Sequence, residues 1–140
     1  MYTPISHYQN MQVTTASPER LLIMLYDGAV NFARIAQDKM KAGDIGGKGT
    51  YIGKVLGIVT ELTSTLDHEK GGKIAEDLER LYAYVIDELM KANINNDQKS
   101  LENATGILSS LRDTWTEAVE IAKQERQESA KLVSGGRNGY

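Results

Sequence analysis

The chain has no cysteine, only two prolines and a single tryptophan among its 140 residues. The lack of cysteine excludes disulfides and thiolate chemistry, and nothing points to an oxidising compartment. Pro4 and Pro18 both lie near the start, so everything after Pro18 is free to be helical. No stretch approaches the roughly 20 apolar residues of a membrane span, and the start lacks a signal-peptide pattern. We therefore expect a cytoplasmic protein without membrane insertion.

The charge balance and the size are those of an ordinary globular domain. The formal net charge is -3, with 25% charged and 41% hydrophobic residues. A nucleic-acid partner would require a basic face, so we expect no nucleic-acid binding. A chain of 140 residues suits one domain whose core can stand alone.

The first helix has clear boundary signals. Ser17 is a typical N-cap, Pro18 suits the first helical position, and Glu19 suits the positive end of the helix dipole. Gly43 follows a basic last turn and is a typical end signal. The sequence therefore predicts a helix that begins at about residue 18 and ends before Gly43.

Three further helices are predicted at about residues 50–66, 73–93 and 98–126. Since no stretch shows strand alternation and the links are short, the fold class is all-α, an antiparallel four-helix bundle. We divide the chain into an N-terminal segment (1–16) that docks on the bundle, the four-helix bundle (17–126) and a tail (127–140). The tail is glycine-rich at its end, and we predict that it is disordered.

The apolar stripes of these helices are wider than a bundle needs. The stripe of the second helix covers roughly 160°, whereas about 100° suffices for packing. The surplus indicates either scattered surface apolar residues or a groove for an apolar helical segment. The predicted groove lies on the second, third and fourth helices and comprises Ile52, Leu56, Val59, Leu62, Tyr82, Ile86, Leu89, Leu108 and Leu111.

The second helix also carries Gly49, Gly53 and Gly57 at four-residue spacing. An interior glycine destabilises a helix by roughly 1 kcal/mol relative to alanine. The strip is an exposed face without packing constraints, a smooth surface that another backbone approaches closely, or a sign that the helix is kept marginally stable so that it can adjust. The sequence leaves these interpretations open.

The N-terminal segment carries large apolar side chains among polar residues, namely Tyr2, Ile5, Tyr8, Met11 and Val13. We hypothesise that they form a plug that occupies part of the groove in the free protein and shields it from aggregation. The alternative is that the segment is a fixed lid over the first helix. Removing a lid would unfold or aggregate the protein, whereas removing a plug would strengthen partner binding.

Catalytic and metal-binding patterns are missing. A di-metal bundle site needs Glu-x-x-His on two helices, but Pro4 and Thr65 stand three positions before the two histidines, His7 and His68. No serine lies in a nucleophile elbow, and the GGK at 71–73 lacks the spacing of a phosphate loop. We therefore expect a protein that is not an enzyme and that uses no cofactor and no metal.

Several separated segments together resemble the flagellar secretion chaperone family FliS. They are ASPERLLIMLYDGA at 16–29, AGD at 42–44, ELTSTLDHEKGGKIAEDLERLYAYVIDELMKANINND at 61–97 and LRDTWTEA at 111–118, with Tyr2 and Tyr8 in the N-terminal pattern. The resemblance covers nearly all of residues 1–123, and nothing from Gln124 onward contributes to it. Gly53 and Gly57 depart from the helix-favouring residues of the family.

The resemblance implies a four-helix cytoplasmic chaperone that binds the disordered C-terminal segment of flagellin. Binding would prevent premature polymerisation, and the complex would be delivered to the export gate of the flagellar type III apparatus, without nucleotide or metal. As part of the plug hypothesis, we expect the released tyrosines to signal a loaded chaperone to the export gate. The alternative from a different class is a self-associating structural bundle, and the same surplus surface would also permit a weak homodimer.

Overall fold

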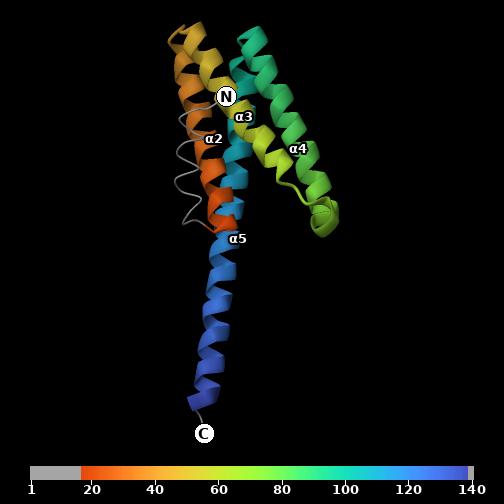
Figure 1. The fold of residues 1–140 in the computed structure, drawn as a ribbon. Helices are drawn as coiled ribbons and strands as arrows, with labels where there is room; N and C mark the ends of the chain where they lie inside the picture. Colours follow the sequence, from red (N-terminus) through yellow and green to blue (C-terminus); the bar gives the residue numbers. More distant parts are fainter. Residues whose placement is uncertain (1–16, 139–140) are drawn as a thin grey trace.

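The computed structural model describes residues 17–138, with side-chain burial given for residues 17–133. This part of the chain folds into four helices: α2 (Pro18–Lys41), α3 (Ile45–Ser64), α4 (His68–Asn95) and α5 (Gln98–Asn138) (Figure 1). The all-α prediction is confirmed for these residues. The plug residues Tyr2, Ile5, Tyr8, Met11 and Val13 lie outside the described residues, so the plug stays a prediction.

Helix α2 begins and ends where the sequence predicts. The Ser17 side chain accepts a hydrogen bond from the backbone N–H of Arg20 at 3.2 Å, and Pro18 occupies the first helical position. After Lys41 the chain turns through Gly43, whose φ of 75° is unfavourable for residues with a side chain. The local signals therefore suffice to set both ends of α2.

Helix α3 begins at Ile45, five residues before the predicted start, so the glycine-rich link is mostly helix. The reason is a cap, because the Asp44 side chain accepts from the backbone N–H of Gly47 at 2.9 Å. Lys48 in the added turn is only 3% exposed. Its burial fixes the first turn of α3 against the rest of the bundle.

Helix α4 also begins earlier than predicted, at His68. Asp67 caps it by accepting from the backbone N–H groups of Glu69 and Lys70. The first turn is separated from the remainder by a kink at Gly72, with φ 49° and ψ −122°. Regular helix therefore runs from residue 73, which is the start that the sequence predicts.

Helix α5 continues to Asn138, whereas the sequence predicted that the helix ends near Arg126 and that a disordered tail follows. The extension contains no proline, and Gln127, Glu128, Ala130 and Lys131 favour a helix, whereas Gly135 and Gly136 do not. All side chains from Glu120 to Val133 are exposed. Figure 1 shows this part of α5 projecting beyond the other three helices.

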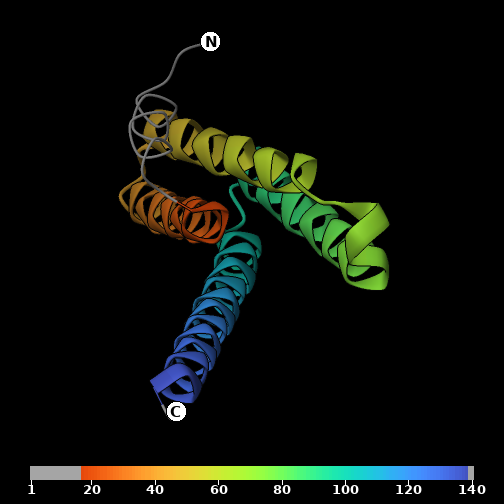
Figure 2. The ribbon, with the colours of Figure 1, turned by 60° about the horizontal axis from the view of Figure 1, so that its bottom comes forward.

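The four helices form a ring in which α2 and α4 each pack against α3 and α5. Full burial of an aliphatic side chain contributes about 1.5–3 kcal/mol. The largest fully buried side chains are Tyr26, Val30, Ile52, Val55, Val59, Leu62, Tyr82, Val85, Leu89, Leu101 and Leu108. Figures 1 and 2 show that α4 leaves the neighbourhood of α5 towards its N-terminal end.

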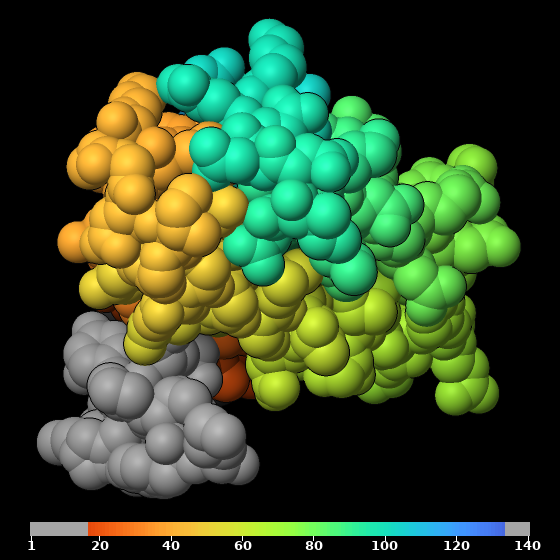
Figure 3. Space-filling view, turned by 90° about the horizontal axis from the view of Figure 1, so that it is seen from above, coloured from red at the N-terminus to blue at the C-terminus, as the bar shows by residue number. Residues whose placement is uncertain are grey.

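The bundle is closed at the end that carries the α2–α3 and α4–α5 links. Viewed from this end, the residues around the two links lie side by side (Figure 3). The Lys48 ammonium donates to the backbone carbonyl of Asn93 at 3.0 Å and to the Asn96 side chain at 3.1 Å. These bonds satisfy acceptors at the C-terminus of α4 and tie α3 to α4.

Candidate functional site

Most of the predicted groove residues are core residues in this structure. Six of the nine are at most 2% exposed, and they are Ile52, Val59, Leu62, Tyr82, Leu89 and Leu108. The width of an apolar stripe does not tell which of its residues face the core and which lie at the surface. That depends on how each helix is rotated about its axis, and packing against the other helices sets this rotation. In the described conformation these six side chains stabilise the bundle and do not form a surface.

The other three predicted residues, Leu56, Ile86 and Leu111, are half-buried at the margin of the core. An added Cβ at Gly49 would lie 3.6 Å from the Asn93 side chain, so these two positions face one another across α3 and α4. Leu56 lies seven residues after Gly49 and Ile86 seven before Asn93, which is about two turns in each helix. Leu56 and Ile86 therefore lie level on adjacent flanks of the antiparallel pair.

The surface beside this pair is apolar. Met90 is 47% exposed and Ile94 is 76% exposed, and both continue the Ile86 flank outward along α4. On α3, an added Cβ at Gly53 would meet nothing within 4 Å, so this glycine is not required by the packing of the bundle. We call the surface formed by Gly53, Leu56, Ile86, Met90 and Ile94 the α3–α4 face.

The sequence did not mark Ile94 as part of this surface, because the third helix was predicted to end at Asn93. The sequence signal that was missed is the asparagine at position 96, in the short link that follows the helix. Asn96 adopts the left-handed conformation typical of a helix end, with φ 53°, so the helix continues to Asn95.

A second region of exposed apolar surface lies at the end of the bundle opposite the two links. Ile74 lies on the apolar stripe of α4 but is 67% exposed. Leu78, one turn further on, is half-buried, and Leu89 is fully buried. The inward stripe of α4 thus emerges from the core towards its N-terminal end, where α4 diverges from α5 (Figure 2).

A pocket of about 200 Å³ lies between the start of α2 and the side of α5. Its apolar lining is formed by Trp115, Ala118, Val119 and Ala122, and the charged side chains of Glu19 and Arg126 complete it. A backbone hydrogen bond at the helix start and the Ser17 side chain hold the pKa of Glu19 below its usual range, and the Arg126 charge adds to this. The pocket adjoins the start of α2, where residues 1–16 join the bundle.

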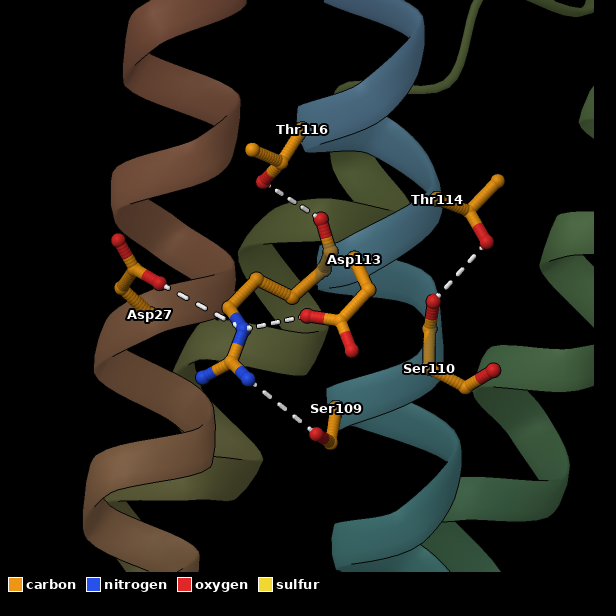
Figure 4. Close-up of polar contacts among 7 residues, drawn as sticks. Asp27, Ser109, Ser110, Asp113, Thr114 and Thr116 are labelled. Atoms are coloured by element: carbon orange, nitrogen blue, oxygen red, sulfur yellow. Dashed lines mark hydrogen bonds and ion pairs between the residues drawn. The ribbon is translucent and has the colours of Figure 1, made fainter.

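One ion pair of Arg112 joins α5 to α2, and the other polar contacts of this side chain lie within α5. The Arg112 guanidinium lies 3.2 Å from Asp113 and 3.8 Å from Asp27 of α2, and it donates to the Ser109 hydroxyl at 3.3 Å (Figure 4). These partly exposed pairs contribute at most about 1 kcal/mol each. Within residues 17–138 no group of three or more His, Asp or Glu side chains could hold a metal ion.

The comparisons with known proteins agree on one family. The family model described as "Flagellar protein FliS" matches residues 1–122. The chain belongs to the FliS family. The flagellar secretion chaperone FliS of Salmonella typhimurium is 39% identical over 104 residues, which cover 74% of this chain and 77% of the relative. The FliS of Bacillus subtilis is 31% identical over 130 residues, or 93% and 96% of the two chains.

A solved structure, "Crystal structure of flagellar chaperone from bacteria", has the same fold, with a TM-score of 0.69 and 16% identity over 84% of this chain and 98% of the other. FliS is a family of flagellar secretion chaperones and not of enzymes. Membership supports a role as a flagellar export chaperone with a flagellar protein as its partner. No helix in the described residues is long and apolar enough to cross a membrane.

Proposed function

We propose that the chain binds the C-terminal segment of flagellin in the cytoplasm, prevents its premature polymerisation and delivers it to the flagellar type III export gate. Membership of the flagellar secretion chaperone family is the observation that carries this proposal. The α3–α4 face supports it, because Met90 and Ile94 are exposed there. These two side chains are not buried in the core of the bundle, so they are free to contact a partner. An amphipathic segment that folds on binding needs such a surface.

The energetics of binding are favourable for a segment of this kind. Ordering a disordered segment costs several kcal/mol, and each Å² of buried apolar surface contributes about 25 cal/mol. A contact that buries of the order of 1,000 Å² or more therefore offsets the ordering cost with a surplus. The α3–α4 face is one part of the proposed contact, and the half-buried Leu111 on α5 is a second part.

We also propose that Tyr2, Ile5, Tyr8, Met11 and Val13 form a plug that covers part of this surface until flagellin binds. Their apolar character supports this proposal, because the bundle exposes apolar surface that such side chains would cover. The pocket lined by Trp115 lies between α2 and α5 and not on the α3–α4 face, so it is a separate apolar contact for the start of the segment beside α2. The released tyrosines would then be available to the export gate.

The binding surface is tested by calorimetric titration of the full chain with the C-terminal segment of a cognate flagellin. Ile86→Asp and Met90→Asp place a charge on the α3–α4 face and should weaken binding at least tenfold, a loss of about 1.4 kcal/mol. Leu132→Asp is the control, because Leu132 is 77% exposed on the projecting part of α5. A folded Met90→Asp variant that binds like the wild type would contradict this surface.

The plug is tested with a chain that lacks residues 1–14. Stronger binding after truncation supports the plug, and unchanged binding keeps the chaperone but excludes the plug. Unfolding or aggregation after truncation would support a fixed lid. If the intact, folded chain binds no flagellin segment, the alternative is a self-associating bundle, whose homodimer would appear as mass that rises with concentration.

A further inference from the structure

Two tyrosines meet in the centre of the bundle. The hydroxyl groups of Tyr26 on α2 and Tyr82 on α4 are hydrogen-bonded to each other, and the side chains are 0% and 2% exposed. Burial raises the pKa of both phenols, so both are neutral at physiological pH. In the described residues α2 and α4 are not packed against each other, since each contacts α3 and α5. The tyrosine pair therefore joins helices at opposite corners of the ring.

Tyr82 stands where α4 changes from buried to exposed. On its C-terminal side the inward-facing Val85 and Leu89 are 0% exposed. On its N-terminal side Leu78 is half-buried and Ile74 is 67% exposed. Ala75 is also buried, but it lies outside the main core cluster, so Tyr82 is the most N-terminal α4 residue of that cluster.

The other end of this exposed part of α4 is a kink. Gly72 has a φ of 49° and divides the first turn from the remainder of the helix. The first turn folds over Ala75, and an added Cβ at Gly71 would be 2.9 Å from the Ala75 Cβ. Residues 73–81, which we call the α4 arm, therefore lie between a glycine kink and a buried polar contact.

We propose that the Tyr26–Tyr82 hydrogen bond is a latch that limits how far the α4 arm moves away from α5. A buried hydroxyl that loses its partner is destabilised unless water reaches it. Opening of the arm supplies that water, so removal of one hydroxyl favours the open arm. Opening would extend the apolar surface around Leu78 and Leu111, and its use for client binding rests on the proposed function.

Hydrogen exchange of the free, full-length chain tests the latch. Tyr82→Phe should speed exchange of the amides of residues 73–81 by about tenfold and leave residues 85–95 unchanged. Tyr84→Phe is the matched control, because Tyr84 is 47% exposed on the same helix, and it should change neither region. Equal acceleration in both regions, or no change in the arm, would overturn the latch.

Tyr26→Phe provides a second test from the opposite helix. It should speed exchange of the same arm on α4, although the substitution lies on α2, because Tyr82 then loses its partner. The double variant leaves no unpaired hydroxyl, so its arm should exchange more slowly than in either single variant. Additive acceleration in the double variant would contradict direct coupling between the two groups.

The outcome for the client is measured separately by titration of the flagellin segment into the same variants. Faster arm exchange with no binding by any chain, the wild type included, would reject the proposed function and leave the latch standing. Unchanged exchange with normal binding would reject the latch and leave the chaperone role standing.

Discussion

At the closed end of the bundle Leu89 and Leu101 are fully buried, whereas at the opposite end Ile74 is 67% exposed and Ile121 48% exposed on the same two helices. The polar contacts of α4 differ in the same way. At the closed end Lys48 of α3 donates to the α4 terminus, and Asn103 of α5 donates to Glu88 at 3.4 Å.

At this open end, the polar contacts between charged and titratable side chains of α4 lie within α4 itself. His68 contacts Glu79 at 3.1 Å, and Asp77 pairs with Lys73 and Arg80. Such exposed pairs contribute little to stability and do not join α4 to another helix. The comparison indicates that the closed end contributes most of the stability of the bundle. At the open end, apolar side chains such as Ile74 are exposed and are not packed in the core.

The largest test of this comparison shortens one side chain at each end of α4. Leu89→Ala should lower the free energy of unfolding by about 2–5 kcal/mol, because it leaves a cavity in the core. Ile74→Ala should change it by no more than about 0.5 kcal/mol, because Ile74 is mostly exposed. Urea unfolding measures both, and a cost of several kcal/mol for Ile74→Ala would mean that the open end is packed in solution.

Lys48→Met tests the polar link at the closed end. The Asn93 carbonyl and the Asn96 side chain would each lose a donor, which should cost about 1–3 kcal/mol of unfolding free energy. Lys73→Met is the control, since the Lys73 side chain is 82% exposed at the open end. Equal Tm values for Lys48→Met and the wild type would show that the link does not stabilise the closed end.

The sequence predicts this fold well where local signals act and less well where packing decides. Ser17 and Pro18 determine the start of α2 through a cap and a fixed φ, and both can be recognised in the sequence. The glycines before Thr50 predict a link, yet Asp44 caps a helix there. The Asp44 cap and the burial of Lys48 together outweigh the low helix propensity of the glycines in this turn.

The candidate surface was predicted less accurately than the fold. Leu56 and Leu62 lie on the same helix and have similar chemistry, but Leu56 is half-buried and Leu62 is fully buried. Their difference depends on how α3 is rotated against α2 and α4, which no local pattern determines. The exposure of Ile74 likewise follows from the divergence of α4, a property of the whole bundle.

Two glycine-to-alanine substitutions should have opposite effects on stability. Gly72→Ala at the open end should destabilise the protein by about 1 kcal/mol, because a side chain is strained at a φ of 49°. Gly53→Ala in α3 should stabilise it by about 0.5–1 kcal/mol, because the position is helical and an added Cβ meets nothing within 4 Å. Stabilisation by both substitutions would show that the Gly72 kink is not maintained in solution.

The smallest expected effect compares the carboxylates at the two ends during acidification. Asp97 at the closed end accepts from the backbone N–H of Ser100 at 3.1 Å, and this bond is the main cause that lowers the pKa of Asp97. Backbone and Ser17 hydrogen bonds lower the pKa of Glu19 at the open end. A carboxyl group whose pKa is lower in the folded chain binds fewer protons there than in the unfolded chain.

Its contribution to stability is therefore complete above the unfolded pKa, about 3.9 for aspartate, and is lost as the pH falls through the lower folded value. Asp97→Asn keeps a capping oxygen but cannot titrate. The Tm of the wild type should thus fall more steeply than that of Asp97→Asn between about pH 5 and pH 2.5. Glu19→Gln should show the same behaviour at the open end. Parallel Tm curves for wild type and Asp97→Asn would mean that the Asp97 carboxylate does not stabilise the start of α5.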